Sequence, residues 1–217
     1  MCQSEVYRSY MAVVGVCVLV ISVFLFFTGS YPSFGESVRK ALFQVTSLAS
    51  TTGFATADTN LWPPVCIVIL IGCSVVCGCS GSTSGGMKFD RLLVCYKSIR
   101  AHLNCLVNPS QVNMVKVDGR PISERRVSDS KTFMAIFMFL IALDAIINTA
   151  FGMDMLSGFT ASIASLSNVG PGFGTVGSMS NYSQLPIILK FNCTFLMLLG
   201  RLEIFSLFYV IGFRNRK

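Results

Sequence analysis

Charged side chains are scarce in this sequence: only 12% of its 217 residues are charged, whereas 53% are hydrophobic. So apolar a composition excludes an ordinary soluble domain and favours a chain embedded in a bilayer. Four apolar stretches are candidates for membrane spans, since roughly 20 helical residues cross the hydrocarbon core. They cover residues 11–27, 61–79, 132–151 and 185–213.

Histidine is almost absent, and His102 is the single example. The nine cysteines are an odd number and lie mostly inside apolar runs, so we interpret them as small hydrophobic residues, not as a disulfide framework. Cys73, Cys77 and Cys79 could together hold a soft metal, but His102 is remote and other polar partners are few. Ser80 lies in a motif that resembles an intramembrane protease, yet no later span has a histidine to activate it.

The first apolar stretch lacks the marks of a cleaved signal peptide. Glu5 and Arg8 leave almost no net charge before it, and bulky phenylalanines occupy the place of small cleavage-site residues. The positive charge gathers elsewhere, in residues 88–131 and at the C-terminal end, residues 214–217. Both segments should therefore be cytoplasmic, with the N- and C-termini inside. This topology accounts for the net charge of +7, so nucleic acid is not an expected partner.

The same arrangement occurs twice along the chain: a span, a short helix, a glycine-bearing loop and another span. In the first copy, Ser33 and Glu36 form a capping box at the start of the short helix; in the second, Asp154 starts it. Each short helix lies between two spans and is typical of a re-entrant pore helix. The predicted bounds are span 10–28, pore helix 34–50, loop 51–54 and broken span 61–106; then a cytoplasmic loop and hairpin, 107–131; then span 132–151, pore helix 154–167, loop 168–172 and span 185–213.

The two loops align residue by residue, 47–53 with 164–170, and both end on a glycine, Gly53 or Gly170. Extended backbone at membrane depth is tolerated where it lines an aqueous path, and its carbonyls can then replace the hydration shell of an ion. The negative end of each pore helix would favour a cation. The alternative is that both glycine motifs are ordinary turns between spans.

Four strings resemble the Trk/Ktr/HKT superfamily over nearly the whole chain. They are Thr51-Thr52-Gly53-Phe54, the glycine-rich stretch 78–88, Asn168-Val169-Gly170-Pro171-Gly172, and the stretch 197–203. Departures are small: Ser50 stands where a third threonine is common, and Cys77 where another glycine often stands. The resemblance implies an all-α membrane protein whose two span, pore helix, span units are the third and fourth repeats of a pseudo-fourfold pore with re-entrant filter loops.

The resemblance also implies the site residues. The selectivity filter would comprise Thr51, Thr52, Gly53, Phe54, Asn168, Val169, Gly170 and Pro171, with K⁺ held by backbone carbonyls near Thr52, Gly53, Val169 and Gly170. An intramembrane gating loop would comprise Gly78, Gly81, Ser82, Thr83, Gly85 and Gly86, with Arg201 projecting toward the ion path. Alternatives remain open: the glycine-rich stretch can be a structural kink, Arg201 can form an ion pair with Glu203 or Asp144, and Lys190 can extend to the membrane interface.

The implied function is potassium uptake across a bacterial inner membrane, with K⁺ as the transported ion, no covalently bound cofactor and no enzymatic activity. Expected partners are membrane lipid, an N-terminal half with the first two repeats, a second copy of the full-length protein, and nucleotide-binding regulatory subunits of the TrkA/KtrA type. Two filter strands cannot surround an ion, so this chain would be a fragment or one part of a larger assembly. The alternative function is a non-conducting membrane scaffold or regulatory subunit that retains the fold.

Overall fold

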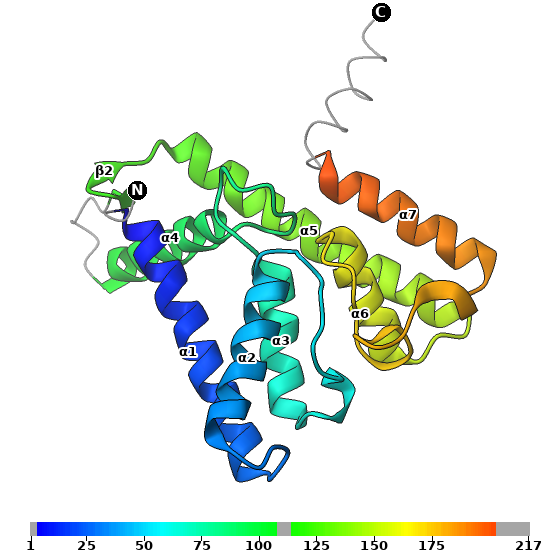
Figure 1. Cartoon of the computed structure of the whole chain (residues 1–217). Helices are drawn as coiled ribbons and strands as arrows, with labels where there is room; N and C mark the ends of the chain where they lie inside the picture. Colours follow the sequence, from blue (N-terminus) through cyan, green and yellow to red (C-terminus); the bar gives the residue numbers. More distant parts are fainter. Residues whose placement is uncertain (1–3, 108–113, 203–217) are drawn as a thin grey trace, which may run out of the picture.

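The computed structural model describes residues 4–107 and 114–202, and helices dominate it (Figure 1). Two groups of three helices follow one another, joined by a further helix and a small hairpin. The first group is α1 (Glu5–Phe27), α2 (Phe34–Ala49) and α3 (Pro64–Val76); the second is α5 (Glu124–Ala150), α6 (Met155–Leu166) and α7 (Ile187–Arg201). Short 3-10 turns precede α3 and α7 at Thr59–Leu61 and Tyr182–Gln184, and another lies at Gly174–Val176.

The two groups use the same local signals at the same places. After each long helix, a glycine in the left-handed region reverses the chain, Gly29 with φ 67° and Gly152 with φ 92°. Each short helix then starts at a side-chain cap. The Ser33 hydroxyl accepts a hydrogen bond from the Glu36 N–H at 3.2 Å, and the Asp154 carboxylate accepts one at its own helix. The repeat seen in the sequence is therefore a repeat of backbone structure.

Between the groups lie α4 (Phe89–Val107) and the strands β1 (Lys116–Val117) and β2 (Arg120–Pro121), which pair antiparallel. Asp118 and Gly119 form the turn, with φ values of 51° and 74°, as a two-residue hairpin requires. This hairpin lies beside the N-terminal end of α1 (Figure 1). The hairpin expected within residues 107–131 is thus seen at 116–121, and residues 108–113 lie outside the described residues.

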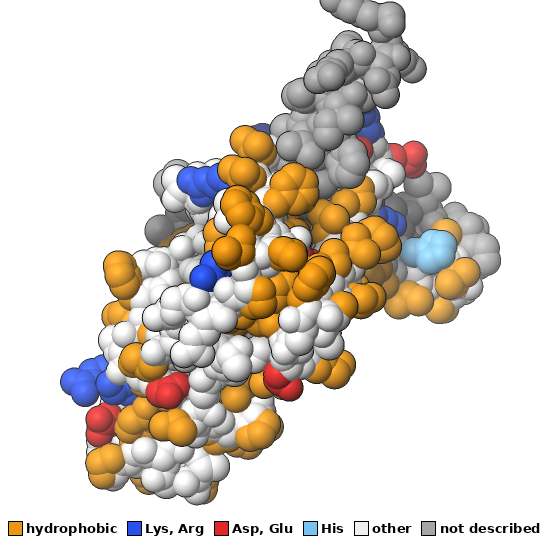
Figure 2. Space-filling model, turned by 90° about the vertical axis from the view of Figure 1, so that its right-hand side faces the viewer, with side chains coloured by type: hydrophobic (Ala, Val, Ile, Leu, Met, Phe, Trp, Pro, Cys, Tyr) orange, Lys and Arg blue, Asp and Glu red, His pale blue; other side chains and the backbone are white. Residues whose placement is uncertain are grey.

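Two helices, α1 and α5, are long and apolar enough to cross a membrane by length and composition. The surface agrees, because many large hydrophobic side chains are exposed, including Ile187, Phe191 and Phe195 along α7. Figure 2 shows hydrophobic side chains over much of one face and few charged ones. The other two expected spans are shorter in the described residues: α3 ends at Val76, and the part of 185–213 beyond Leu202 lies outside them.

One predicted boundary was wrong. The loop 107–131 was expected to run to the next span, but α5 already begins at Glu124, with the Ser123 hydroxyl as its cap. The charged residues that suggested a loop form the first turns of this helix, since exposed charged residues are compatible with a helix that extends beyond the apolar layer. The core has two main parts, one inside each group of helices. Val169 of the second group packs in the core of the first, which joins the two.

Candidate functional site

The two short helices, α2 and α6, end in the same unusual way. The residue after the helix cap is in the left-handed region in both cases, Thr51 with φ 57° and Asn168 with φ 54°. Glycine normally occupies this position, because a side chain there costs roughly 1–2 kcal/mol. A β-branched threonine is especially disfavoured. Such strain is retained where the surrounding structure requires one particular backbone path.

The hydrogen bonds that close the two helices match as well. The N–H of Thr52 donates to the carbonyl of Ser47 at 2.9 Å, and the N–H of Val169 donates to the carbonyl of Ala164 at 3.0 Å. Together with the left-handed residue, these bonds form a Schellman motif. Each motif turns the chain away from its helix into a glycine loop. We call residues 51–54 the first glycine loop and residues 168–172 the second glycine loop.

The two glycine loops lie against each other. Gly53 has φ 76° and Gly170 has φ 107°, so both adopt a conformation that side chains rarely allow. A Cβ atom on Gly53 would lie 2.3 Å from the carbonyl oxygen of Val169 and 3.2 Å from Pro171. A Cβ atom on Gly170 would have nothing within 4 Å. The glycine of the first loop is therefore needed for close contact with the second loop.

Hydrogen bonds from neighbouring side chains hold the carbonyls of these loops. The Ser47 hydroxyl donates to the Phe54 carbonyl at 2.6 Å, and the Tyr182 hydroxyl donates to the Gly170 carbonyl at 3.1 Å. A carbonyl oxygen has two lone pairs, so one such bond leaves the other free to face an ion. Phe54 and Gly170 were predicted from the sequence, but Tyr182 was not, since nothing in its local sequence points to the loop.

A second set of contacts joins the segments that follow the loops. The side-chain amide of Asn60 bonds both the N–H and the carbonyl of Gly174, at 2.9 and 3.0 Å, and a Cβ atom on Gly177 would meet this amide at 2.3 Å. The hydroxyl of Ser178 accepts a hydrogen bond from the Thr59 N–H at 3.1 Å. These bonds hold the two repeats in register beside the glycine loops. They could not be predicted, because the partners are over 100 residues apart.

The glycine-rich loop, residues 78–86, separates α3 from α4. Cys77 leaves α3 with φ 54°, and Gly81 and Gly86 have φ values of 87° and 72°. A Cβ atom on Gly85 would lie 2.2 Å from the carbonyl oxygen of Ser167, at the end of α6. The Ser82 and Ser84 hydroxyls bond each other at 2.6 Å within the loop. The glycine-rich loop therefore packs directly against the start of the second glycine loop.

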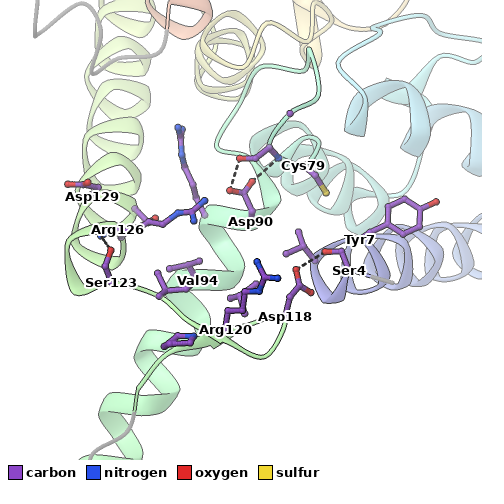
Figure 3. A pocket seen from close by; sticks show the side chains of 18 of the residues that line it. Ser4, Tyr7, Cys79, Asp90, Val94, Asp118, Arg120, Ser123, Arg126 and Asp129 are labelled. Carbon is purple, nitrogen blue, oxygen red and sulfur yellow. Dashed lines mark hydrogen bonds between the residues drawn. The ribbon is translucent and has the colours of Figure 1, made fainter. Parts of the chain in front are cut away.

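Two charged side chains, one from α4 and one from α7, hold the glycine-rich loop. The Arg201 guanidinium, at the end of α7, donates to the Thr83 carbonyl at 2.6 Å. The Asp90 carboxylate, in the first turn of α4, accepts from the N–H and the hydroxyl of Ser80 at 2.9 and 2.6 Å (Figure 3). A cavity of about 200 Å³ lies between this loop and Arg201. Arg201 was predicted from the sequence, but Asp90 was not, because its position in the first turn of a helix was its only signal.

Arg201 does not pair with Asp144. The Asp144 carboxylate instead accepts hydrogen bonds from Asn148, Ser162 and Asn192, and Glu203 lies outside the described residues. Among residues 4–107 and 114–202, no group of three or more His, Cys, Asp or Glu side chains could hold a metal ion.

A larger cavity, of about 1240 Å³, lies on the side of the glycine-rich loop that faces the hairpin (Figure 3). Asp90, Arg120 and Arg126 are among its lining residues. Next to it, Glu5 forms an ion pair with Lys97, and this hydrogen bond lowers the pKa of the Glu5 carboxyl. The carbonyl of Lys116 and the turn at Asp118 complete this contact, so α1, α4 and the hairpin are tied together.

A family model described as "TrkH: Cation transport protein" matches residues 11–213. The chain is 34% identical over 203 residues to the Trk system potassium uptake protein TrkH of Escherichia coli K12, covering 93% of this chain and 41% of that protein. It is 33% identical over 189 residues to the TrkH protein of Halomonas elongata, covering 87% of this chain and 39% of that protein.

A solved structure gives the same picture. The crystal structure of the potassium transporter TrkH from Vibrio parahaemolyticus superposes with a TM-score of 0.86 and 33% identity, covering 94% of this chain and 43% of that chain. These matches confirm the family resemblance and the all-α membrane fold that the sequence predicted. The chain spans about two fifths of the length of the curated relatives that it matches.

Proposed function

The chain belongs to the TrkH family of cation transport proteins, and we propose on that premise that it forms half of a potassium-conducting pore. Its first and second glycine loops would be two of four filter strands. K⁺ would be bound by backbone carbonyls near Thr52, Gly53, Val169 and Gly170, in place of its hydration water. The chain would carry out uptake as the membrane-embedded subunit and would need no bound cofactor.

One observation carries this proposal: the glycine loops have the same backbone path and touch. Matching left-handed residues and hydrogen bonds orient both chains as they leave α2 and α6, and Gly53 lies against the Val169 carbonyl. Both helix C-terminal ends therefore meet at the loops, and each contributes roughly half a negative charge there. Unrelated helix ends often share the Schellman motif, but two independent surface turns would not bring Gly53 against the Val169 carbonyl.

The ring of strands would be completed by another part of the assembly. A Cβ atom on Gly53 would meet Val169, whereas a Cβ atom on Gly170 would have no described atom within 4 Å. By the pseudosymmetry of the repeats, a further filter strand fits beside Gly170. The greater length of the relatives supports an N-terminal half with two more repeats as its source.

The glycine-rich loop would act as the gate below this filter. It packs under the end of α6 and is held by Arg201 at the Thr83 carbonyl, so a movement of the loop changes the floor of the ion path. Gly78, Gly81, Ser82, Gly85 and Gly86 would allow that movement, because small side chains and left-handed glycines rearrange at low cost. Arg201 would repel cations from the path while the loop is closed.

The cytoplasmic side would be the side of the hairpin, α4 and the N-terminal end of α1. Lys and Arg residues gather there, including Lys97, Arg120 and Arg126, as the positive-inside rule requires. We place the protein in the bacterial inner membrane with both termini inside. This basic face would meet lipid headgroups and nucleotide-binding regulatory subunits of the TrkA/KtrA type, and the full-length protein would form a homodimer.

Rubidium uptake in a potassium-transport-deficient bacterium tests the function. Strains would produce this chain alone, this chain with a matching N-terminal half, and the pair with either Gly53→Asp or Gly152→Asp. Gly152 is the matched control, because it also has a positive φ but nothing within 4 Å of an added Cβ. We expect uptake from the pair and from its Gly152→Asp variant, and none from the Gly53→Asp variant. A well-inserted pair without uptake would reject conduction and favour a non-conducting scaffold.

A further inference from the structure

A buried carboxylate lies behind the second short helix without a cationic partner among the described residues. Asp144, on α5, is only 3% exposed. Its oxygens accept hydrogen bonds from the amide of Asn148 at 2.8 Å, the hydroxyl of Ser162 at 2.6 Å and the amide of Asn192 at 2.5 Å. These four residues, here called the Asp144 cluster, connect α5, α6 and α7 (Figure 1).

The first repeat has apolar residues at the same four positions. The positive-φ glycines Gly29 and Gly152 align α1 with α5, the left-handed residues Thr51 and Asn168 align α2 with α6, and the prolines before α3 and α7 align those helices. By these alignments, the Asp144 cluster corresponds to Ile21, Leu25, Val45 and Ile69. All four apolar side chains belong to, or pack against, the core of the first group of helices.

This correspondence shows whether the polar side chains of the second repeat are needed for helix packing. The same helix arrangement is stable with aliphatic side chains at these positions, so polar residues are not needed to bring three such helices together. A carboxylate in a membrane interior is costly, even when hydrogen-bonded, and normally faces a cavity or a counter-charge. The polar set in the second repeat therefore requires a reason other than helix packing.

The cationic side chains described on α7 form hydrogen bonds with groups other than Asp144. Arg201 donates to the Thr83 carbonyl, and Lys190 donates to the Ser183 carbonyl at 2.6 Å. All three side chains that bond Asp144 are neutral. Neutral donors hold a carboxylate in place and leave its negative charge uncompensated, so its field acts on the surroundings.

We propose that Asp144 is a fixed buried charge that raises the cation affinity of the second glycine loop. Ser162, which bonds it on α6, lies about 9 Å before Asn168 along the direction of the helix axis. Asp144 thus adds to the negative end of α6 without touching the ion. This inference rests on the proposed potassium pathway, in which the loop binds the cation.

The size of the effect follows from Coulomb's law. A unit charge on the order of 10 Å from the second glycine loop, the scale set by the spacing of Ser162 and Asn168, changes cation affinity on the order of tenfold at an effective dielectric constant of about 20. The test is rubidium uptake by the reconstituted pair carrying either Asp144→Asn or the fourfold variant Asp144→Ile, Asn148→Leu, Ser162→Val and Asn192→Ile. The fourfold variant installs the apolar residues of the first repeat, so it removes the charge while keeping a set that packs in this arrangement.

Asp129→Asn is the matched control, since Asp129 is an exposed aspartate on the same helix, about 22 Å from Asp144 along its axis. Its field is screened by solvent ions. We expect both Asp144 variants to raise the apparent KM for rubidium about tenfold with a maximal rate within about twofold of the wild type, and Asp129→Asn to leave both unchanged.

Three results would overturn the inference: a fourfold variant with the wild-type KM, a fourfold variant that does not accumulate in the membrane, or an equal rise in KM for Asp129→Asn. A wild-type pair without uptake would instead reject the proposed function. In that case, the measurement is the rubidium concentration needed to raise the Tm of the purified pair. Asp144→Asn should raise this concentration, and Asp129→Asn should leave it unchanged.

Discussion

Replacing Gly53 and Gly170 separately with alanine tests the contact between the glycine loops. Both glycines have a positive φ, so alanine costs roughly 1–2 kcal/mol at either position. At Gly53 the new methyl group would also lie 2.3 Å from the Val169 carbonyl oxygen, closer than Cβ contacts occur in proteins. Relieving that overlap moves one loop by about 1 Å and adds a further 1–3 kcal/mol, as in an overpacked core.

The assay is thermal unfolding of the purified chain in detergent, with Gly15→Ala as a control. Gly15 lies within α1 with nothing within 4 Å, so alanine should stabilise the helix by about 0.5–1 kcal/mol. At about 2–4 °C per kcal/mol, Gly53→Ala should lower the Tm by roughly 10 °C and Gly170→Ala by about half as much. Equal losses from the two variants would refute the reasoning, because they would show that the contact with Val169 costs nothing.

Three further changes have defined outcomes. Asp90→Ala removes both bonds to Ser80 and should free the glycine-rich loop, so rubidium uptake by the reconstituted pair should rise severalfold without regulatory subunits; unchanged uptake would contradict this. Asn60→Ala breaks two bonds between the repeats and should destabilise the chain by about 1–3 kcal/mol in thermal unfolding, whereas a loss below 0.5 kcal/mol would show that the contact is dispensable. Lys97 lowers the pKa of Glu5, so this ion pair stabilises the fold above the usual glutamate pKa of about 4.3 and that stability is lost as pH falls through the lowered value. Glu5→Gln should therefore lower the free energy of unfolding at pH 7 by less than about 1 kcal/mol for this partly exposed pair, and the loss should shrink as the pH falls.

Local signals predicted most of the helix boundaries. Ser33 and Asp154 cap the short helices where the sequence placed their starts, and the spans expected from 61 and 185 begin as helices at Pro64 and Ile187. The break between α3 and α4 also followed from the glycine-rich composition of the chain there. The start of α5 was missed, because a charged segment that extends beyond the apolar layer gives the same signal as a loop.

The contacts around the loops could not be predicted in this way. Asp90 bonds a serine ten residues earlier, across a break in the helix, and Arg201 reaches a carbonyl 118 residues away. From the sequence, Asp144 was named only as an alternative ion-pair partner of Arg201, but its observed partners come from three helices. Such pairs depend on how the helices pack, which a single sequence does not encode locally.

By itself, the sequence determined the repeated order of span, short helix, glycine loop and span, because apolar length, caps and glycines act over a few residues. It also determined which residues could form the loops, since the two glycine strings align. Only the tertiary structure decided that Gly53 lies against Val169, that Thr83 is held by Arg201, and that polar residues replace an apolar cluster behind α6. Each of these contacts joins helices far apart in the chain, and its geometry is set by the packing of whole helices.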